Sequence, residues 1–180
     1  MTIRLVNGIL IDADTLDGST LALLALVTDL TTHADLITGM HGVVVAHKTA
    51  DETLNNDDTL QNDDHLFFAV AVNEVWEVFV AVMAQSPTLT TLKSLFAIPA
   101  AATFMELGTL KWSALDTLTD LTVERAQGGM VATAKKLQFR GLYVGGANAG
   151  SIQFQWAQNA ATAEDTKVLA DSFIIAHRLK

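Results

Sequence analysis

The chain has 180 residues, 50% of them hydrophobic and 17% charged, with a net charge of −9 and no cysteine. This length and apolar content predict one packed core and exclude a disordered or collagen-like chain. The acidic balance argues against nucleic acid as a partner, because phosphate binding depends on lysine and arginine, and the absence of cysteine excludes disulfides and thiolate metal sites.

The shortage of charge predicts that part of the surface is covered, since soluble proteins usually carry about 25% charged residues. A membrane is not the expected cover, because the longest apolar runs, 21–27 and 78–84, have seven residues each and a spanning helix needs about 20. The N-terminus also lacks the apolar stretch and cleavage site of a signal peptide. We therefore expect no membrane insertion and no export by that route.

The charge is distributed unevenly along the chain. Residues 1–65 hold eleven acidic and two basic side chains, which is the whole net charge, whereas residues 66–180 hold nine of each. The sequence thus predicts an acidic N-terminal third and a neutral, sparsely charged body.

The first predicted element is a helix over about residues 19–38, with Ser19 or Thr20 as its cap and Gly39 at its end. Within it, positions of a heptad seam recur as in a short coiled coil, which we expect to self-associate. An amphipathic helix packed on its own domain is the alternative. We expect the histidine in the seam to fix the register rather than bind an ion. The seam residues are Leu23, Leu26, Leu30, His33 and Ile37.

After residue 42 the hydrophobic period changes to two, which is typical of half-buried antiparallel strands. The clearest case is 151–158, where Ile152, Phe154 and Trp156 share one face. Further strands are expected at 42–47, 65–72, 75–84, 92–98, 103–112, 118–124, 137–144 and 168–179, separated by turns such as 55–58 and 61–64.

About nine strands without intervening helices predict a mainly β protein. We expect an N-terminal connector over residues 1–42 with a short α-helix, followed by an antiparallel, jelly-roll-like β-sandwich over 43–180. Runs such as 67–72 and 78–84 are apolar on both faces, so their outer faces are expected under another layer or against another subunit, as in a trimer.

Residues that could carry chemistry are few. No GxSxG, HExxH, P-loop or GxGxxG motif is present. The acidic pairs 57–58 and 63–64 could serve glycoside hydrolysis or calcium binding, but pairs on turns rich in asparagine are more simply solvated loops. We expect no enzyme activity, no cofactor and no metal ion.

Aromatic side chains could contact a ligand if they are exposed. Trp76 and Trp156 lie in apolar alternation and are expected in the core. Trp112 lies beside Lys111 near the end of a predicted strand, and it is the candidate for an exposed ligand contact.

Several segments resemble known proteins. Residues 13–18, 27–33 and 38–43 resemble connectors that recur in tailed-bacteriophage fibre and appendage proteins, and residues 59–64, 72–76, 155–159 and 169–174 resemble a β-sandwich domain of phage virion structural proteins. The resemblance implies a homotrimer located in the virion and assembled in the host cytoplasm. It also implies other virion proteins of the capsid or tail as partners, with a host surface glycan or protein as a further one.

The expectation is therefore a non-enzymatic virion structural protein: a trimeric surface appendage of the short-fibre or receptor-binding type, anchored by its N-terminal segment. Two alternatives stay open, a capsid cement or decoration protein that stabilises the head and a carbohydrate-binding module.

Overall fold

The computed structural model describes residues 3–6, 9–12, 42–86, 91–107, 119–127 and 133–180. Contacts divide the chain into two units, Met1–His41 and Gly42–Lys180. In the first unit β1 (Ile3–Val6) and β2 (Ile9–Asp12) pair as an antiparallel ribbon, which the sequence did not predict. The predicted helix at 19–38 and its seam lie outside the described residues.

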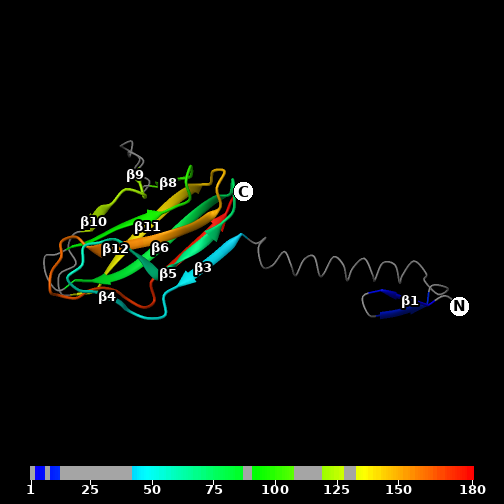
Figure 1. Cartoon of the computed structure of the whole chain (residues 1–180), viewed down its shortest axis with the longest axis horizontal. Coiled ribbons are helices and arrows are strands. Elements are labelled where there is room, and N and C mark those ends of the chain that lie inside the picture. Colours follow the sequence, from blue (N-terminus) through cyan, green and yellow to red (C-terminus); the bar gives the residue numbers. More distant parts are fainter. Residues whose placement is uncertain (1–2, 7–8, 13–41, 87–90, 108–118, 128–132) are drawn as a thin grey trace, which may run out of the picture. The chain divides into compact units, whose positions relative to one another are not determined.

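The second unit consists of two antiparallel sheets (Figure 1). The smaller sheet has the order β10 (Arg125–Gln127), β7 (Leu92–Ala97), β12 (Gly150–Gln158), β5 (Gln61–Val70). The larger sheet has the order β3 (Val43–His47), β14 (Phe173–Arg178), β6 (Val75–Gln85), β11 (Lys135–Val144), β8 (Thr103–Glu106), β9 (Thr119–Asp120). Beside β6, β13 (Thr166–Val168) pairs with β4 (Glu52–Leu54).

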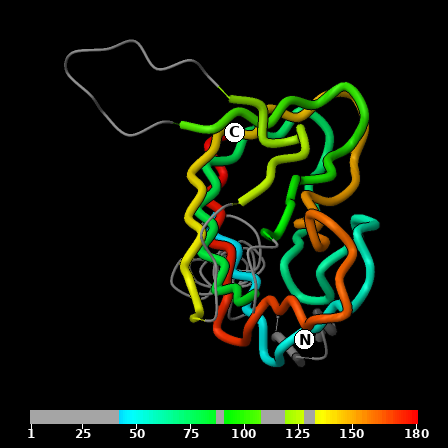
Figure 2. The backbone as a smooth tube through the Cα atoms, turned by 90° about the vertical axis from the view of Figure 1, so that its left-hand side faces the viewer, coloured from blue at the N-terminus to red at the C-terminus, as the bar shows by residue number. Residues whose placement is uncertain are grey.

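The two sheets lie face to face as layers, and Figure 2 shows β11 and β14 of the larger sheet on one side and β5 of the smaller sheet on the other. Each long strand turns alternate side chains into the space between the layers. The burial of that apolar face is the main force that holds such layers together. The buried side chains on the inner faces of β6 and β12 are Trp76, Val78, Val80, Val82 and Ala84 on β6 and Ile152, Phe154 and Trp156 on β12.

Phe96 of β7 is the central aromatic contact between the layers. Its ring lies 5.1 Å from that of Phe104 on β8 and 6.0 Å from that of Phe139 on β11, both in edge-to-face geometry. On its own sheet it lies 5.3 Å from the ring of Phe154. These offset arrangements are the ones that ring quadrupoles favour.

The prediction of a mainly β, antiparallel protein is confirmed, and most strands lie where the alternation placed them. Trp76 and Trp156 are buried, as expected. No helix among the described residues is long and apolar enough to span a membrane.

Several predicted strands are wrong in extent. The strand expected at 65–72 is β5, which begins at Gln61, and the strand expected at 103–112 is β8, which ends at Glu106. Of the strand expected at 118–124, the described residues 119–124 contain only β9, because the Asp120 carboxylate accepts hydrogen bonds from the N–H and the hydroxyl of Thr122 and so turns the chain before β10. The segment 168–179 is divided into β13 and β14 by a turn in which Asp171 has a φ of 65° and the Ser172 hydroxyl donates to the Leu169 carbonyl. Such local side-chain bonds compete with the strand ladder.

We predict that Phe96→Ala destabilises the protein by about 3–5 kcal/mol, because it removes a side chain that is 2% exposed and leaves a cavity between the sheets. Phe67→Ala is the matched control, because Phe67 is 46% exposed on the outer face of β5, which points away from the core. This variant should lower the free energy of unfolding by about 1 kcal/mol or less. Urea denaturation measures both. Equal losses for the two variants would contradict the assignment of Phe96 to the centre of the core.

Candidate functional site

A fully buried lysine is the most unusual polar feature of the described residues. Lys48 follows β3 directly, and its backbone N–H donates to the Ser172 carbonyl at 2.8 Å while its own carbonyl accepts the N–H of Asp171. These bonds continue the pairing of β3 with β14 and direct the side chain inward. Lysine is almost never fully buried unless it is paired, and here the Nζ atom donates to Glu52 Oε2 at 2.7 Å and to Asp63 Oδ2 at 2.9 Å.

Asp63 supplies the second part of the cluster from β5, in the other sheet. Its side chain is also fully buried. While Oδ2 faces the ammonium group, Oδ1 accepts the backbone N–H groups of His65 and Leu66, both at 2.9 Å. The main-chain carbonyl of Asp63 accepts the Gln153 side-chain amide from β12 at 2.9 Å. The carboxylate is therefore fixed from both of its oxygen atoms.

Glu52, at the start of β4, completes the cluster and is its most exposed member. Its Oε2 atom accepts the Lys48 ammonium and, at 3.2 Å, the backbone N–H of Asp64. One cation thus lies between two carboxylates, and the three side chains come from the end of β3, from β4 and from β5. The cluster fastens one edge of the larger sheet to the smaller sheet.

The interpretation of residues 61–64 as a solvated turn is wrong, because these residues are the first part of β5 and Asp63 is buried. The pairing of β5 with β12 explains the error. Gln153 pairs with Phe67, but Gln155 pairs with Asn62, so the register shifts between them. This irregularity breaks the simple alternation and lets an acidic side chain point inward.

The other acidic pair fits its interpretation as a loop. Asp57 and Asp58 lie between β4 and β5; Asp57 accepts the N–H of Thr59 at 2.8 Å, and Asp58 is exposed.

Within the described ranges, no group of three or more His, Asp or Glu side chains comes together as a possible metal site.

A second polar cluster holds the C-terminal end of the chain. Arg178 Nη1 donates to Glu74 Oε1 at 2.9 Å, and the Trp76 indole N–H and the Ala71 N–H donate to Glu74 Oε2. Burial by itself raises the pKa of Glu74, but the three hydrogen bonds and the Arg178 charge outweigh it and hold the pKa below its ordinary value of 4.5.

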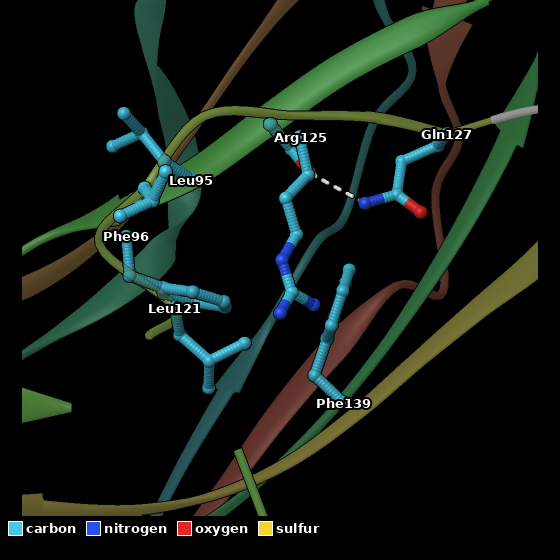
Figure 3. Close-up of a pocket in the computed structure, with 8 residues that line it drawn as sticks. Leu95, Phe96, Leu121, Arg125, Gln127 and Phe139 are labelled. Carbon is cyan, nitrogen blue, oxygen red and sulfur yellow. Dashed lines mark hydrogen bonds between the residues drawn. The ribbon is translucent and has the colours of Figure 1, made fainter. Parts of the chain in front are cut away.

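A small pocket opens between β7, β10 and β11 (Figure 3). Its volume of about 10 Å³ leaves room for roughly one water molecule. The Arg125 guanidinium group donates to Glu106 at 2.7 Å, and Gln127 donates to Ser94 at 3.5 Å. The pocket is too small for a substrate or a cofactor.

The outer face of the larger sheet carries an exposed apolar patch. Val45 on β3 pairs with Ile175 on β14, which pairs with Phe79 on β6, and the three form one row across the sheet. Val45 is 62% exposed and Ile175 40%. We call this surface the outer apolar face; it consists of the exposed side chains of Val43, Val45 and Ile175 and the half-buried side chains of Phe79 and Phe173.

The structure does not test the site residues that the sequence analysis proposed. The seam residues Leu23, Leu26, Leu30, His33 and Ile37 and the candidate ligand contact Trp112 lie outside the described residues. The Lys48 cluster was missed, since sequence alone gives no sign that three charges separated by up to 15 positions meet in the interior.

Asp63→Ala should cost about 3–5 kcal/mol, because it leaves a buried ammonium group without one of its two carboxylates. The double variant Lys48→Met/Asp63→Leu should be more stable than Asp63→Ala, because it removes the buried charge as well. Asp165→Ala is the control: it breaks the exposed 3.8 Å pair with Lys167 and should cost about 1 kcal/mol or less. Urea denaturation separates these cases, and an Asp63→Ala loss no larger than that of the control would contradict the buried pair.

Acidification should weaken the contact between Glu74 and Arg178. Because the pKa of Glu74 is lower in the folded protein than in the unfolded chain, its contribution is complete above pH 4.5 and is lost as the pH falls through the lower folded-state value. Urea denaturation from about pH 6 to about pH 3 measures this fall in stability. Glu74→Gln should flatten part of it, whereas identical pH profiles for the two proteins would refute the assignment.

Comparisons with known proteins leave the chain without an assigned family. No family model matches it, and no curated protein matches it in sequence. Among solved structures, it is similar to a chain in "Structure of infectious bursal disease virus Gx strain", with 10% sequence identity and a TM-score of 0.28 over 76% of this chain and 39% of that one. The chain therefore spans about two fifths of the length of that neighbour, and a TM-score this low supports no inference about function.

Proposed function

We propose that the protein is a non-enzymatic structural protein of a phage virion, assembled as a homotrimer. In this proposal it is a surface appendage of the short-fibre or receptor-binding type. Its N-terminal segment anchors it to other virion proteins, and its β-sandwich is displayed toward a host surface glycan or protein. The observation that carries the proposal is the outer apolar face, and the resemblance of the connector and body segments to phage structural proteins names the setting.

The chain path supports a jelly-roll-like arrangement. Strands β5, β6, β7 and β8 alternate between the smaller and the larger sheet, as do β10, β11 and β12. A chain that crosses repeatedly between layers is typical of double-sheet folds with long connections, of which the jelly roll is one. Such a sandwich presents two broad outer faces, and one of them can be covered by a neighbouring subunit.

The outer apolar face fits a contact between copies of this chain. Contiguous exposed apolar side chains mark interaction surfaces, since each one left in water costs free energy. Along the same row, Phe79 pairs with Arg140 on β11, and Arg140 forms an ion pair with Glu77. An apolar centre bounded by charged residues is the anatomy of a protein interface.

The edge of the larger sheet lies beside this face. Within the described residues β3 pairs with β14 and with no strand on its other side. Unpaired edges are rarely left open to water in native proteins. Because Val43 and Val45 belong to that edge strand, a neighbouring subunit would cover the exposed edge and the apolar side chains together.

The chain should behave as a trimer in solution. Size-exclusion chromatography with light scattering should give a mass three times 19.3 kDa at micromolar concentration. A monomer of 19.3 kDa would overturn the proposal. Retention on capsids that lack tails would favour the cement alternative, and binding to glycans by the isolated protein would favour a receptor or carbohydrate role.

Charge placed on the outer apolar face should weaken the trimer. Val45→Lys should lower the association constant at least tenfold, because an interface that buries an unpaired ammonium group loses more than about 1.4 kcal/mol. Val123→Lys is the matched control, since Val123 is equally exposed but lies in the turn between β9 and β10. If both variants dissociate to the same extent, or if neither does, the outer apolar face is not the contact.

A further inference from the structure

We propose that Lys48 and Asp63 become joined by an amide bond, an intramolecular isopeptide cross-link for which Glu52 transfers the proton. The proposal is independent of the virion assignment. It rests on the three buried side chains and on the backbone groups around them.

The Lys48 amine lies in hydrogen-bond contact with the carboxyl group that it would join. Lys48 Nζ lies 2.9 Å from Asp63 Oδ2, and that oxygen is bonded to Cγ, the carbon that the amine would attack. Both side chains are fully enclosed. Reactants held in contact by a rigid fold react as if at very high concentration, because the entropy of bringing them together is lost during folding.

The reaction needs a neutral amine and a neutral carboxylic acid. The ion pair and this neutral pair differ only by the position of one proton in the hydrogen bond between Nζ and Oδ2. Transfer of that proton within the hydrogen bond gives the two neutral groups that react, and two charges are more costly to keep apart from water than two neutral groups.

The backbone is arranged to stabilise the intermediate. When Nζ adds to Cγ, negative charge develops on Oδ1, the oxygen that already accepts the N–H groups of His65 and Leu66 at 2.9 Å each. Two fixed N–H donors on the developing oxyanion are the arrangement that accelerates acyl transfer in enzymes. The same two bonds satisfy the buried carboxylate before the reaction.

Glu52 is placed to move the proton. Its Oε2 atom lies 2.7 Å from Nζ, so the carboxylate can accept a proton from nitrogen as the C–N bond forms and return it to Oδ2. The C–Oδ2 bond then breaks and one water molecule leaves. The C–N bond replaces the C–O bond, the glutamate is regenerated, and nothing is oxidised or reduced.

The amide would fasten the end of β3 to β5 and hence one sheet to the other. The described lysines that pair with acids elsewhere lack this setting. Lys93 lies 3.5 Å from Glu124, but the glutamate is half exposed, and the described contacts place no backbone N–H on its carboxylate. Lys93 is therefore an internal control for Lys48, because it pairs with a carboxylate but should not form an amide.

Peptide mass analysis of the full-length folded protein tests the cross-link. Trypsin cleaves after Arg4, Lys48 and Lys93, so the unmodified chain yields peptides 5–48 and 49–93. We expect instead a single peptide 5–93 whose mass is lower than its sequence mass by one water molecule, with normal cleavage after Lys93. Recovery of separate peptides 5–48 and 49–93 from folded protein would overturn the proposal.

Three variants assign the atoms. Glu52→Gln should fold, retain Lys48 and Asp63, and yield the two separate peptides. Asp63→Asn should lose ammonia in place of water if it reacts, and Lys48→Arg should give no loss. Circular dichroism with a cooperative thermal transition confirms folding. Complete cross-linking in Glu52→Gln would exclude the role of the glutamate, and loss of water in Lys48→Arg would exclude the bond itself.

Discussion

The packing of two antiparallel sheets through one aromatic centre is the constraint on which the rest of this structure depends. Phe96 contacts Phe104 and Phe139 across the layers, and these contacts determine which face of each strand points inward. Because strand side chains alternate, the same choice leaves Val45 and Ile175 outside. The outer apolar face is thus a consequence of the core, since strands that are apolar on both sides can bury only one side within a single sandwich.

The Lys48 cluster places charged side chains between the same two sheets, where they are shielded from water. A polar group can be enclosed only if its hydrogen bonds are satisfied. Here the ammonium group has two carboxylate partners, and both oxygen atoms of the Asp63 carboxylate have donors. An ion pair at this junction would leave the sheets free to separate when the protein unfolds. An amide would keep the two strands connected in the unfolded chain as well.

The sequence predicted the strands whose apolar residues form a simple pattern. It missed the features that depend on an irregular strand or on the packing of one sheet against the other. Strand β12 follows regular alternation and β6 contains an unbroken apolar run, and both were predicted to within one residue at each end. Asp63 was assigned to a turn because the run 61–64 is polar and acidic, whereas in the structure it lies in β5, where a register shift relative to β12 accompanies its inward-facing side chain. The meeting of Lys48 with Asp63 depends on the contact between the sheets, and no local pattern in either segment reports it.

A crystallographic electron-density map around Lys48 is the most direct measurement of the central claim, that a buried lysine fastens the two sheets together. The account predicts unbroken density from Lys48 Nζ to Asp63 Cγ, with one carboxylate oxygen of Asp63 replaced by nitrogen, the other held by the N–H groups of His65 and Leu66, and Glu52 beside the bond. Separate density for Lys48 Nζ and Asp63 in an unreacted ion pair would contradict the cross-link, and a Lys48 side chain that extends into solvent would contradict the fastening of the sheets as well.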